Sequence, residues 1–167
     1  ALLAPGALEV VRQHGQCGIC LMHMQGEPDS MQQAPVYADV MEEVRSFLSA
    51  RLAAVRQAGV ADERITLDPG IGFGKTPEHN LTLMRRQREL LSFGLPLLLG
   101  WSRKSTLGQI TGRPVDQRLV ASVAAALAAI EQGAGIVRVH DVGATADALK
   151  VWAAAGLLDG AQNSVTI

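Results

Sequence analysis

The segment RITLDPG at residues 64–70 decides the fold class of this 167-residue chain. Its residues 64–68 alternate apolar and polar side chains with a period of two, and Pro69-Gly70 follows at once. Such a pattern predicts a short strand that ends in a turn. Three further short apolar runs, at residues 19–24, 97–99 and 136–139, are also predicted to be strands.

Helical patterns alternate with these four runs. Apolar residues recur at spacings of three and four between residues 40 and 55, and Gly59 stands where that helix would stop. Further helices are predicted at about 80–91, just after Lys104, at about 116–132 and after Gly143. Strands that alternate with helices indicate parallel βα units. They fit an open doubly wound sheet or part of a (β/α)₈ barrel, and both place ligands at the carboxyl ends of strands.

Composition narrows the class of protein. The chain is 48% hydrophobic and 19% charged, which excludes a disordered chain and a coiled coil. A net charge of −1 gives no overall attraction for nucleic acid or an anionic membrane. Neither a bilayer-spanning apolar run nor a basic leader segment is visible. We therefore expect one domain, residues 1–167, in a cytoplasmic protein with neither nucleic-acid nor membrane partners.

A cluster of potential zinc ligands stands near the first predicted strand: His14, Cys17, Cys20 and His23. A strand over residues 19–24 would point Cys20 and His23 to opposite faces, so the two could not meet one ion. We expect a buried structural cysteine at Cys20, a loop cysteine at Cys17, and no metal site.

Two other motifs are incomplete. Gly74-Lys75-Thr76 resembles the end of a phosphate-binding loop, but Pro69 occupies the position of its first glycine. The segment GWSRK at residues 100–104 resembles a nucleophile elbow, but Lys104 replaces the closing glycine. Neither nucleotide binding nor a serine hydrolase is predicted.

The ends of the predicted strands carry groups that could bind a ligand. Asp68 precedes three glycines within five residues, which let the backbone turn tightly, and Phe73 between two of them could form an apolar wall. A carboxylate there can accept two N–H groups of a planar heterocycle, or it can simply cap a turn. Lys104 can contact a carbonyl, a ring nitrogen or a phosphate, or it can lie in an exposed basic turn.

Arg138 and His140 stand two residues apart in the last predicted strand, so both would lie on one face and could bind the same anion. The alternative is that Arg138 forms a structural ion pair with Asp141 or a glutamate. Taken together, the strand ends predict a site for a heterocycle that carries a phosphate or diphosphate.

Four segments resemble the dihydropteroate synthase family: LMHMQG at 21–26, LDPGIGFGK at 67–75 followed by His79-Asn80, GWSRKS at 100–105 and RVHDV at 138–142. The resemblance implies an α/β fold of the (β/α)₈ barrel type. It also implies that this chain is the C-terminal half of the barrel, strands 5–8, as four parallel βα units plus a leading helix.

The same resemblance implies a reaction of folate biosynthesis. A transferase would condense 6-hydroxymethyl-7,8-dihydropterin diphosphate with 4-aminobenzoate and release 7,8-dihydropteroate and pyrophosphate. Lys104, Arg138 and His140 would be the catalytic residues. Mg²⁺ would be bound mainly through the substrate diphosphate, with its protein ligand outside this chain.

The resemblance also assigns substrate contacts. Asp68 and Lys104 would hold the pterin beside Gly100, and Arg138 with His140 would bind the diphosphate. The residues bordering the 4-aminobenzoate site, where sulfonamides would compete, would be Phe73, Lys104 and Ser105. Met22 could line the pterin pocket, although a strand methionine can equally belong to the core.

The family further implies a homodimer. An alternative to the enzyme is an isolated half barrel that binds pterin diphosphate, or that self-associates through its open strand edges, without catalysis.

Overall fold

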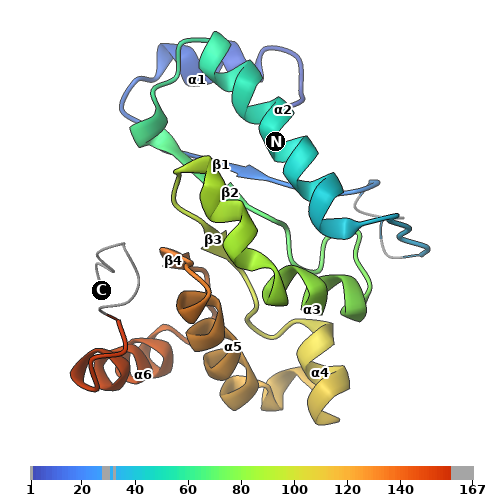
Figure 1. Ribbon diagram of the computed structural model, residues 1–167, viewed down its shortest axis with the longest axis vertical. Coiled ribbons are helices and arrows are strands. Elements are labelled where there is room, and N and C mark those ends of the chain that lie inside the picture. The colour runs from blue at the N-terminus through green and yellow to red at the C-terminus, as the bar shows by residue number, and fades with distance from the viewer. Residues whose placement is uncertain (1, 28–30, 32, 159–167) are drawn as a thin grey trace.

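A computed structural model describes residues 2–27, 31 and 33–158 of the chain (Figure 1). Its α-helices and strands, in chain order, are α1 (Ala7–Gln13), β1 (Ile19–Met22), α2 (Val40–Gln57), β2 (Ile65–Asp68), α3 (Pro77–Arg85), β3 (Leu98–Leu99), α4 (Ser105–Thr111), α5 (Leu119–Glu131), β4 (Ile136–Val137) and α6 (Val142–Ala154). Short 3₁₀ helices lie at Asp62–Arg64, Gln87–Phe93 and Val115–Gln117. The predicted alternation of strand and helix is confirmed.

The strands stand side by side in chain order, from β1 to β4 (Figure 1). β1 pairs in parallel with β2, and β3 pairs in parallel with β4. A parallel bridge between Leu67 and Leu97 links the two pairs, and the Leu67 N–H donates to the carbonyl of Pro96 at 3.0 Å. A doubly wound sheet reverses its strand order at a switch point, whereas barrel strands follow one another. The observed order is that of part of a barrel.

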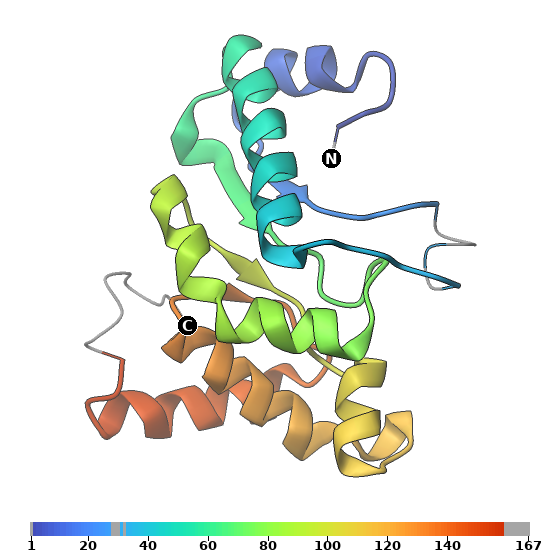
Figure 2. The ribbon, with the colours of Figure 1, turned by 45° about the vertical axis from the view of Figure 1, so that its right-hand side comes forward.

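The helices cover one face of the strands (Figure 2). Leu21, Leu67 and Leu99 point to this side and are almost fully buried with the apolar faces of α2 and α3. On the opposite, inner face, Cys20 is exposed and Ile136 is 42% exposed. The expectation that Cys20 is buried is therefore wrong, because no described segment covers this inner face.

Local sequence signals set the helix ends. Asp39 caps α2, and its carboxylate accepts the N–H groups of Met41 and Glu42. Thr76 caps α3 in a capping box with His79. The helix predicted to run from about residue 80 to 91 is interrupted at Arg86, where α3 ends and the 3₁₀ helix Gln87–Phe93 begins.

The last strand is shorter than predicted. β4 ends at Val137, so Arg138 and His140 lie in the segment that follows it and not on one strand face. The strand-periodicity argument for their convergence is therefore wrong, and their positions are set by other contacts described below. Within the described residues, no helix is long and apolar enough to cross a membrane.

Candidate active site at the strand ends

Asp68 is the central group at the carboxyl end of the strands. It is the last residue of β2, opposite Met22 of β1, and is 1% exposed. One carboxylate oxygen accepts the Gly70 N–H at 2.7 Å, and the other lies 3.2 Å from a guanidinium nitrogen of Arg138. A carboxylate has about four acceptor positions, so these contacts leave room for N–H donors of a ligand.

The glycine turn that follows Asp68 lies against the end of β1. Gly70 and Gly74 have φ angles of 71° and 61°, in the left-handed region. A Cβ on Gly70 would overlap the carbonyl oxygen of His23, and one on Gly74 would overlap that of Gln25. The alternate glycines are therefore required both for backbone conformation and for close approach to β1.

Side chains from three directions hold the backbone of this turn. The Lys75 ammonium donates to the carbonyls of Gly70 and Phe73, at 3.0 and 3.1 Å. Asn80 accepts the Gly72 N–H at 2.9 Å, and the Tyr37 hydroxyl donates to the Gly74 carbonyl at 2.7 Å. Side-chain hydrogen bonds therefore hold the backbone of this turn at Gly70, Gly72, Phe73 and Gly74.

Lys104 lies over Phe73. The distance from its Nζ to the centre of the Phe73 ring is 4.1 Å, which is a cation–π contact. Its aliphatic stem passes close to Gly72, where a Cβ would lie 2.9 Å from the Lys104 Cδ. Lys104 immediately precedes α4, and the exposed Ser105 is the first residue of that helix.

Arg138 reaches across the strand ends to Asp68, and its side chain remains 54% exposed. Gly100 provides the space, because a Cβ on Gly100 would lie 3.1 Å from an Arg138 guanidinium nitrogen. Of the alternatives left open by the sequence, an ion pair of Arg138 with Asp141 is wrong. Asp141 instead pairs with Arg103 at 2.7 Å.

His140 is oriented by Ser102. The Ser102 oxygen lies 2.9 Å from His140 Nδ1 and also accepts the His140 backbone N–H at 3.1 Å. Ser102 is 5% exposed, whereas His140 is exposed. Ser102, the serine of the incomplete nucleophile-elbow motif, therefore orients the side chain of His140.

Three cationic side chains, Arg138, Lys75 and Lys104, lie near the single carboxylate of Asp68 at the strand ends. Burial raises the pKa of Asp68, while the Gly70 N–H and then Arg138, Lys75 and Lys104 act to lower it. Burial and the charge of Arg138 lower the pKa of Lys104, against the opposite effect of Asp68. Burial lowers the pKa of Lys75 to about 7. An excess of positive charge in a cleft attracts anionic ligands.

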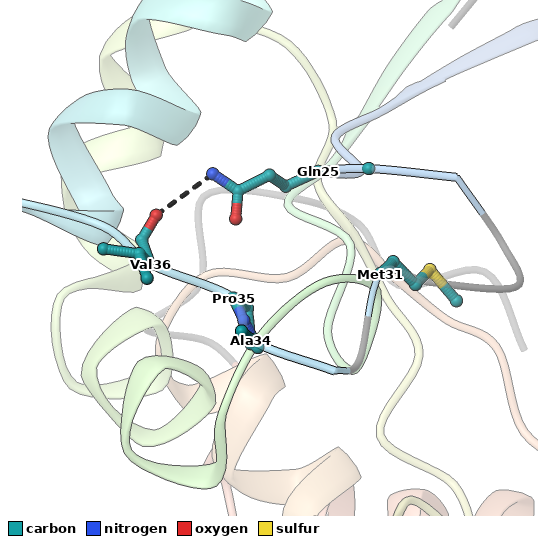
Figure 3. Close-up of a pocket in the computed structure, with 6 residues that line it drawn as sticks. Gln25, Met31, Ala34, Pro35 and Val36 are labelled. Carbon is teal, nitrogen blue, oxygen red and sulfur yellow. Dashed lines mark hydrogen bonds between the residues drawn. The ribbon is translucent and has the colours of Figure 1, made fainter.

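Two hollows lie away from this centre. One, of about 250 Å³, is lined by Gln25, Gly26, Met31, Ala34, Pro35 and Val36. Figure 3 shows the Gln25 amide of this hollow donating to the Val36 carbonyl, at 3.1 Å. The other, of about 470 Å³, lies between the 3₁₀ helix Val115–Gln117 and α5, and Val120 and Arg113 are among its lining residues. Neither contains a predicted site residue.

Residues 3–140 match the family model described as pterin binding enzyme. The chain belongs to the pterin-binding enzyme family. Within that family it is similar to the dihydropteroate synthase of Neisseria meningitidis serogroup C, with 56% identity over 94% of this chain and 56% of the relative. This pterin-binding chain spans about half the length of the curated relatives that it matches.

This pterin-binding chain matches part of the fold of solved dihydropteroate synthases. The enzyme from Stenotrophomonas maltophilia, with imidazole in its active site, matches 93% of this chain and 58% of its own, with 51% identity and a TM-score of 0.90. A Yersinia pestis enzyme solved with a sulfonamide drug matches 93% of this chain over 56% of its own length, with 45% identity and a TM-score of 0.88. The Xanthomonas albilineans enzyme solved with 4-aminobenzoic acid matches 93% of this chain over 55% of its own length, with 44% identity and a TM-score of 0.86.

The described residues contain no group of three or more histidine, cysteine, aspartate or glutamate side chains placed to hold a metal. The buried carboxylate at the strand ends, Asp68, already contacts Gly70 and Arg138. Of the cysteine and histidine residues considered as zinc ligands, Cys20 is exposed and His23 is buried.

Sequence reasoning gave no role to several residues that shape this pterin-binding chain's site. Lys75 and Ser102 stand in segments that resemble the family and in the two incomplete motifs, but neither pattern assigns them the contacts seen in the structure. Asn80 stood in a family motif without a function, and Tyr37 had no signal of its own. Lys75 could have been found, because a lysine directly after alternating glycines is well placed to bind their carbonyls.

Proposed function

We propose that this chain is the C-terminal half of a dihydropteroate synthase barrel, a single partial domain over residues 1–167 corresponding to strands 5–8. Its proposed role is in the condensation of 6-hydroxymethyl-7,8-dihydropterin diphosphate with 4-aminobenzoate. The observation that carries the proposal is the convergence of Asp68, Lys104 and Arg138 at one end of the strands.

The pterin would bind at Asp68. Its pyrimidine ring presents N–H donors, and the free acceptor positions of a buried carboxylate suit them. Gly100, without a side chain, leaves space beside Arg138, and Met22 stands opposite Asp68 on β1. Lys104 lies over Phe73 and is close enough to Asp68 for their charges to interact, so it can contact the pterin.

In the reaction, the C–O bond between the pterin methylene and the diphosphate breaks, and pyrophosphate leaves with the bonding electrons. The amine nitrogen of 4-aminobenzoate forms a bond to the methylene carbon and loses a proton. Arg138 and His140 would stabilise the negative charge on the leaving diphosphate. No protein nucleophile is needed, which is consistent with the role of Ser102 in holding His140.

The arylamine would bind beside Phe73, Lys104 and Ser105. Phe73 offers an aromatic surface and Lys104 a positive charge near it. The similar X. albilineans enzyme was solved with 4-aminobenzoic acid and that of Y. pestis with a sulfonamide drug. We extend both ligand classes to this chain. Mg²⁺ would be carried by the diphosphate.

The proposed homodimer is supported by an exposed apolar surface on α4, α5 and the segment between them. Its large side chains are Ile110, Val115, Leu119 and Val120. Val120 is 80% exposed and borders the hollow of about 470 Å³. Val120→Glu should shift the sedimentation of a dimer to that of a monomer, and unchanged sedimentation of a dimer would exclude this surface.

Pyrophosphate release tests the proposed reaction. The 167-residue chain is incubated with pterin diphosphate, 4-aminobenzoate and Mg²⁺, beside Lys104→Ala and the exposed control Lys150→Ala. Release that depends on Lys104 but not on Lys150 supports the reaction. A folded chain that binds pterin diphosphate without release supports the alternative of a non-catalytic, pterin-binding half barrel. A chain that binds neither substrate contradicts both of these and leaves the self-associating half barrel.

A further inference from the structure

Lys75 is the only buried lysine or arginine among the described residues. It is 3% exposed, and its Nζ has three partners: His23 Nδ1 at 2.9 Å, the Gly70 carbonyl at 3.0 Å and the Phe73 carbonyl at 3.1 Å. An ammonium group has three N–H donors and no acceptor. The three partners therefore satisfy the group completely, which offsets the cost of burying its charge.

The contact with His23 fixes the state of that ring. At a pH below the Lys75 pKa of about 7, the group is an ammonium that can only donate, so Nδ1 of His23 must accept. Burial and the charge of Lys75 lower the pKa of His23 to about 3, so above that pH the ring is neutral, with its proton on Nε2. The ring is 5% exposed and packs edge-on against Phe47, with centroids 5.0 Å apart. Lys75 thus joins the glycine turn to a rigid group at the end of β1.

The contacts with Gly70 and Phe73 fix the turn itself. The Gly70 carbonyl also accepts the Phe73 N–H at 3.1 Å, so the turn is closed by its own hydrogen bond and held by the ammonium at both ends. The Phe73 ring leaves this turn and lies under Lys104. A displacement of the turn would move the aromatic wall relative to the lysine.

We propose that Lys75 is a positioning residue for the arylamine subsite: by holding Gly70, Phe73 and His23 together, it fixes the Phe73 ring against Lys104. The ligand named here rests on the proposed function, but the contacts within the chain do not. The charged and titratable groups that act on Lys75 are Asp68, Lys104 and His23. The charge of Asp68 favours the ammonium form, and that of Lys104 opposes it.

NMR spectroscopy of Lys75→Met tests the positioning directly. A ring face 4.1 Å from Lys104 Nζ shifts the neighbouring Lys104 methylene protons upfield. We expect that shift to be lost in Lys75→Met and kept in the control Lys150→Met, which removes an exposed lysine 66% accessible to solvent. A folded Lys75→Met protein that keeps the upfield shift overturns the proposal.

A measurement on the unaltered chain decides the matter if Lys75→Met does not fold. Long-range ¹H–¹⁵N spectra report which ring nitrogen of His23 carries the proton. At a pH between the His23 pKa of about 3 and the Lys75 pKa of about 7, an unprotonated Nδ1 with a protonated Nε2 is expected. A proton on Nδ1 would overturn the proposal, since the ammonium could not donate to it.

Binding of 4-aminobenzoate separates this inference from the proposed function. If the unaltered chain binds it, Lys75→Met should raise the dissociation constant on the order of tenfold, because a displaced Phe73 ring loses its aromatic contact with the ligand. An unchanged constant would overturn the proposal. Failure of the unaltered chain to bind 4-aminobenzoate would count against the proposed function, while the two NMR results would still decide the role of Lys75.

Discussion

Asn80 of α3 donates from its amide to the hydroxyl of Thr106 in α4, at 3.0 Å, and both side chains are about 1% exposed. The same amide accepts the N–H of Gly72 at 2.9 Å. One buried side chain therefore connects the glycine turn that carries Phe73 with the helix that follows Lys104. The two sides of the proposed arylamine subsite are therefore positioned together.

Thr106→Val should reveal this connection. Valine has the shape of threonine but leaves the Asn80 amide with a buried, unpaired N–H, which costs about 1–3 kcal/mol. Urea unfolding should show a loss of free energy in that range. Thr66→Val, at a half-buried position of β2, is the control and should change stability by less than about 1 kcal/mol. Equal effects of the two substitutions would contradict the argument.

Gly70→Ala should be among the most damaging small substitutions in the chain. Its φ of 71° disfavours a side chain, and the added Cβ would overlap the His23 carbonyl. We expect destabilisation of more than about 2 kcal/mol in thermal or urea unfolding. Gly143→Ala is the matched control, because a Cβ there meets nothing within 4 Å in the first turn of α6. Alanine there should be neutral or stabilise by up to about 1 kcal/mol. Similar losses in both variants would show that close approach is not the cause.

Much of this fold could be predicted from the sequence, since the signals are local. The turn at Pro69-Gly70 and the apolar spacing of α2 placed their elements within a few residues. The exposure of Cys20 could not be predicted, because strand periodicity gives the face of a residue and not what covers it. The end of β4 at Val137 was also missed, since the apolar pattern continues beyond the pairing with β3.

The site residues also divide into those with a local sequence signal and those whose role depends on distant contacts. Asp68, Lys104 and Arg138 stood out because charged groups at strand ends are chemically conspicuous. The partner of Arg138 could not be deduced, since Asp68 is 70 residues distant in the chain and the nearby Asp141 was the simpler choice. The contacts of Lys75 with His23 and of Asn80 with Thr106 could not be deduced either, because these partners belong to distant elements.

His23 should make the folded state sensitive to acid. Burial, and then the charge of Lys75, lower the pKa of His23 in the fold to about 3, from an ordinary value of 6.5. Between pH 6.5 and 3 the unfolded chain therefore binds a proton on His23 that the folded chain does not. The free energy of unfolding falls as the pH drops through this range. The slope due to this group is at most about 1.4 kcal/mol per pH unit.

Urea unfolding at several pH values checks the acid sensitivity. His23→Asn should flatten the dependence between pH 6.5 and 4, even though it lowers stability at neutral pH. His14→Asn removes an exposed histidine and should leave the slope unchanged. An identical slope in His23→Asn and the unaltered chain would show that His23 is not the responsible group.

Ser102→Ala should weaken binding of pyrophosphate through His140. The substitution removes an oxygen that contacts both His140 Nδ1 and its backbone N–H. We expect the dissociation constant, measured by calorimetry, to rise roughly threefold to tenfold, corresponding to one neutral hydrogen bond. Ser92→Ala removes an exposed hydroxyl bound to the Glu89 carbonyl and should have no effect. A normal constant in Ser102→Ala would mean that His140 either does not contact the anion or keeps its orientation without Ser102.

Asp68→Asn should separate recognition of the pterin from that of the diphosphate. Asparagine can present its oxygen either to the Gly70 N–H or to Arg138, and its NH₂ group must face the other donor. The ligand then also loses a charged acceptor. Binding of 6-hydroxymethyl-7,8-dihydropterin should weaken roughly tenfold to a hundredfold, the range expected for hydrogen bonds to a charged group.

Pyrophosphate binding should respond differently to the same substitution. Asp68→Asn releases Arg138 from its ion pair and removes a negative charge near the anion, so affinity for pyrophosphate should be unchanged or higher. Arg138→Gln should show the opposite pattern, with pyrophosphate binding lost and pterin binding mostly kept. Asp147→Asn, in an exposed pair with Lys150, should alter neither. If Asp68→Asn weakened both ligands equally, the carboxylate would act by holding the site together, and a separate pterin subsite at Asp68 would be excluded.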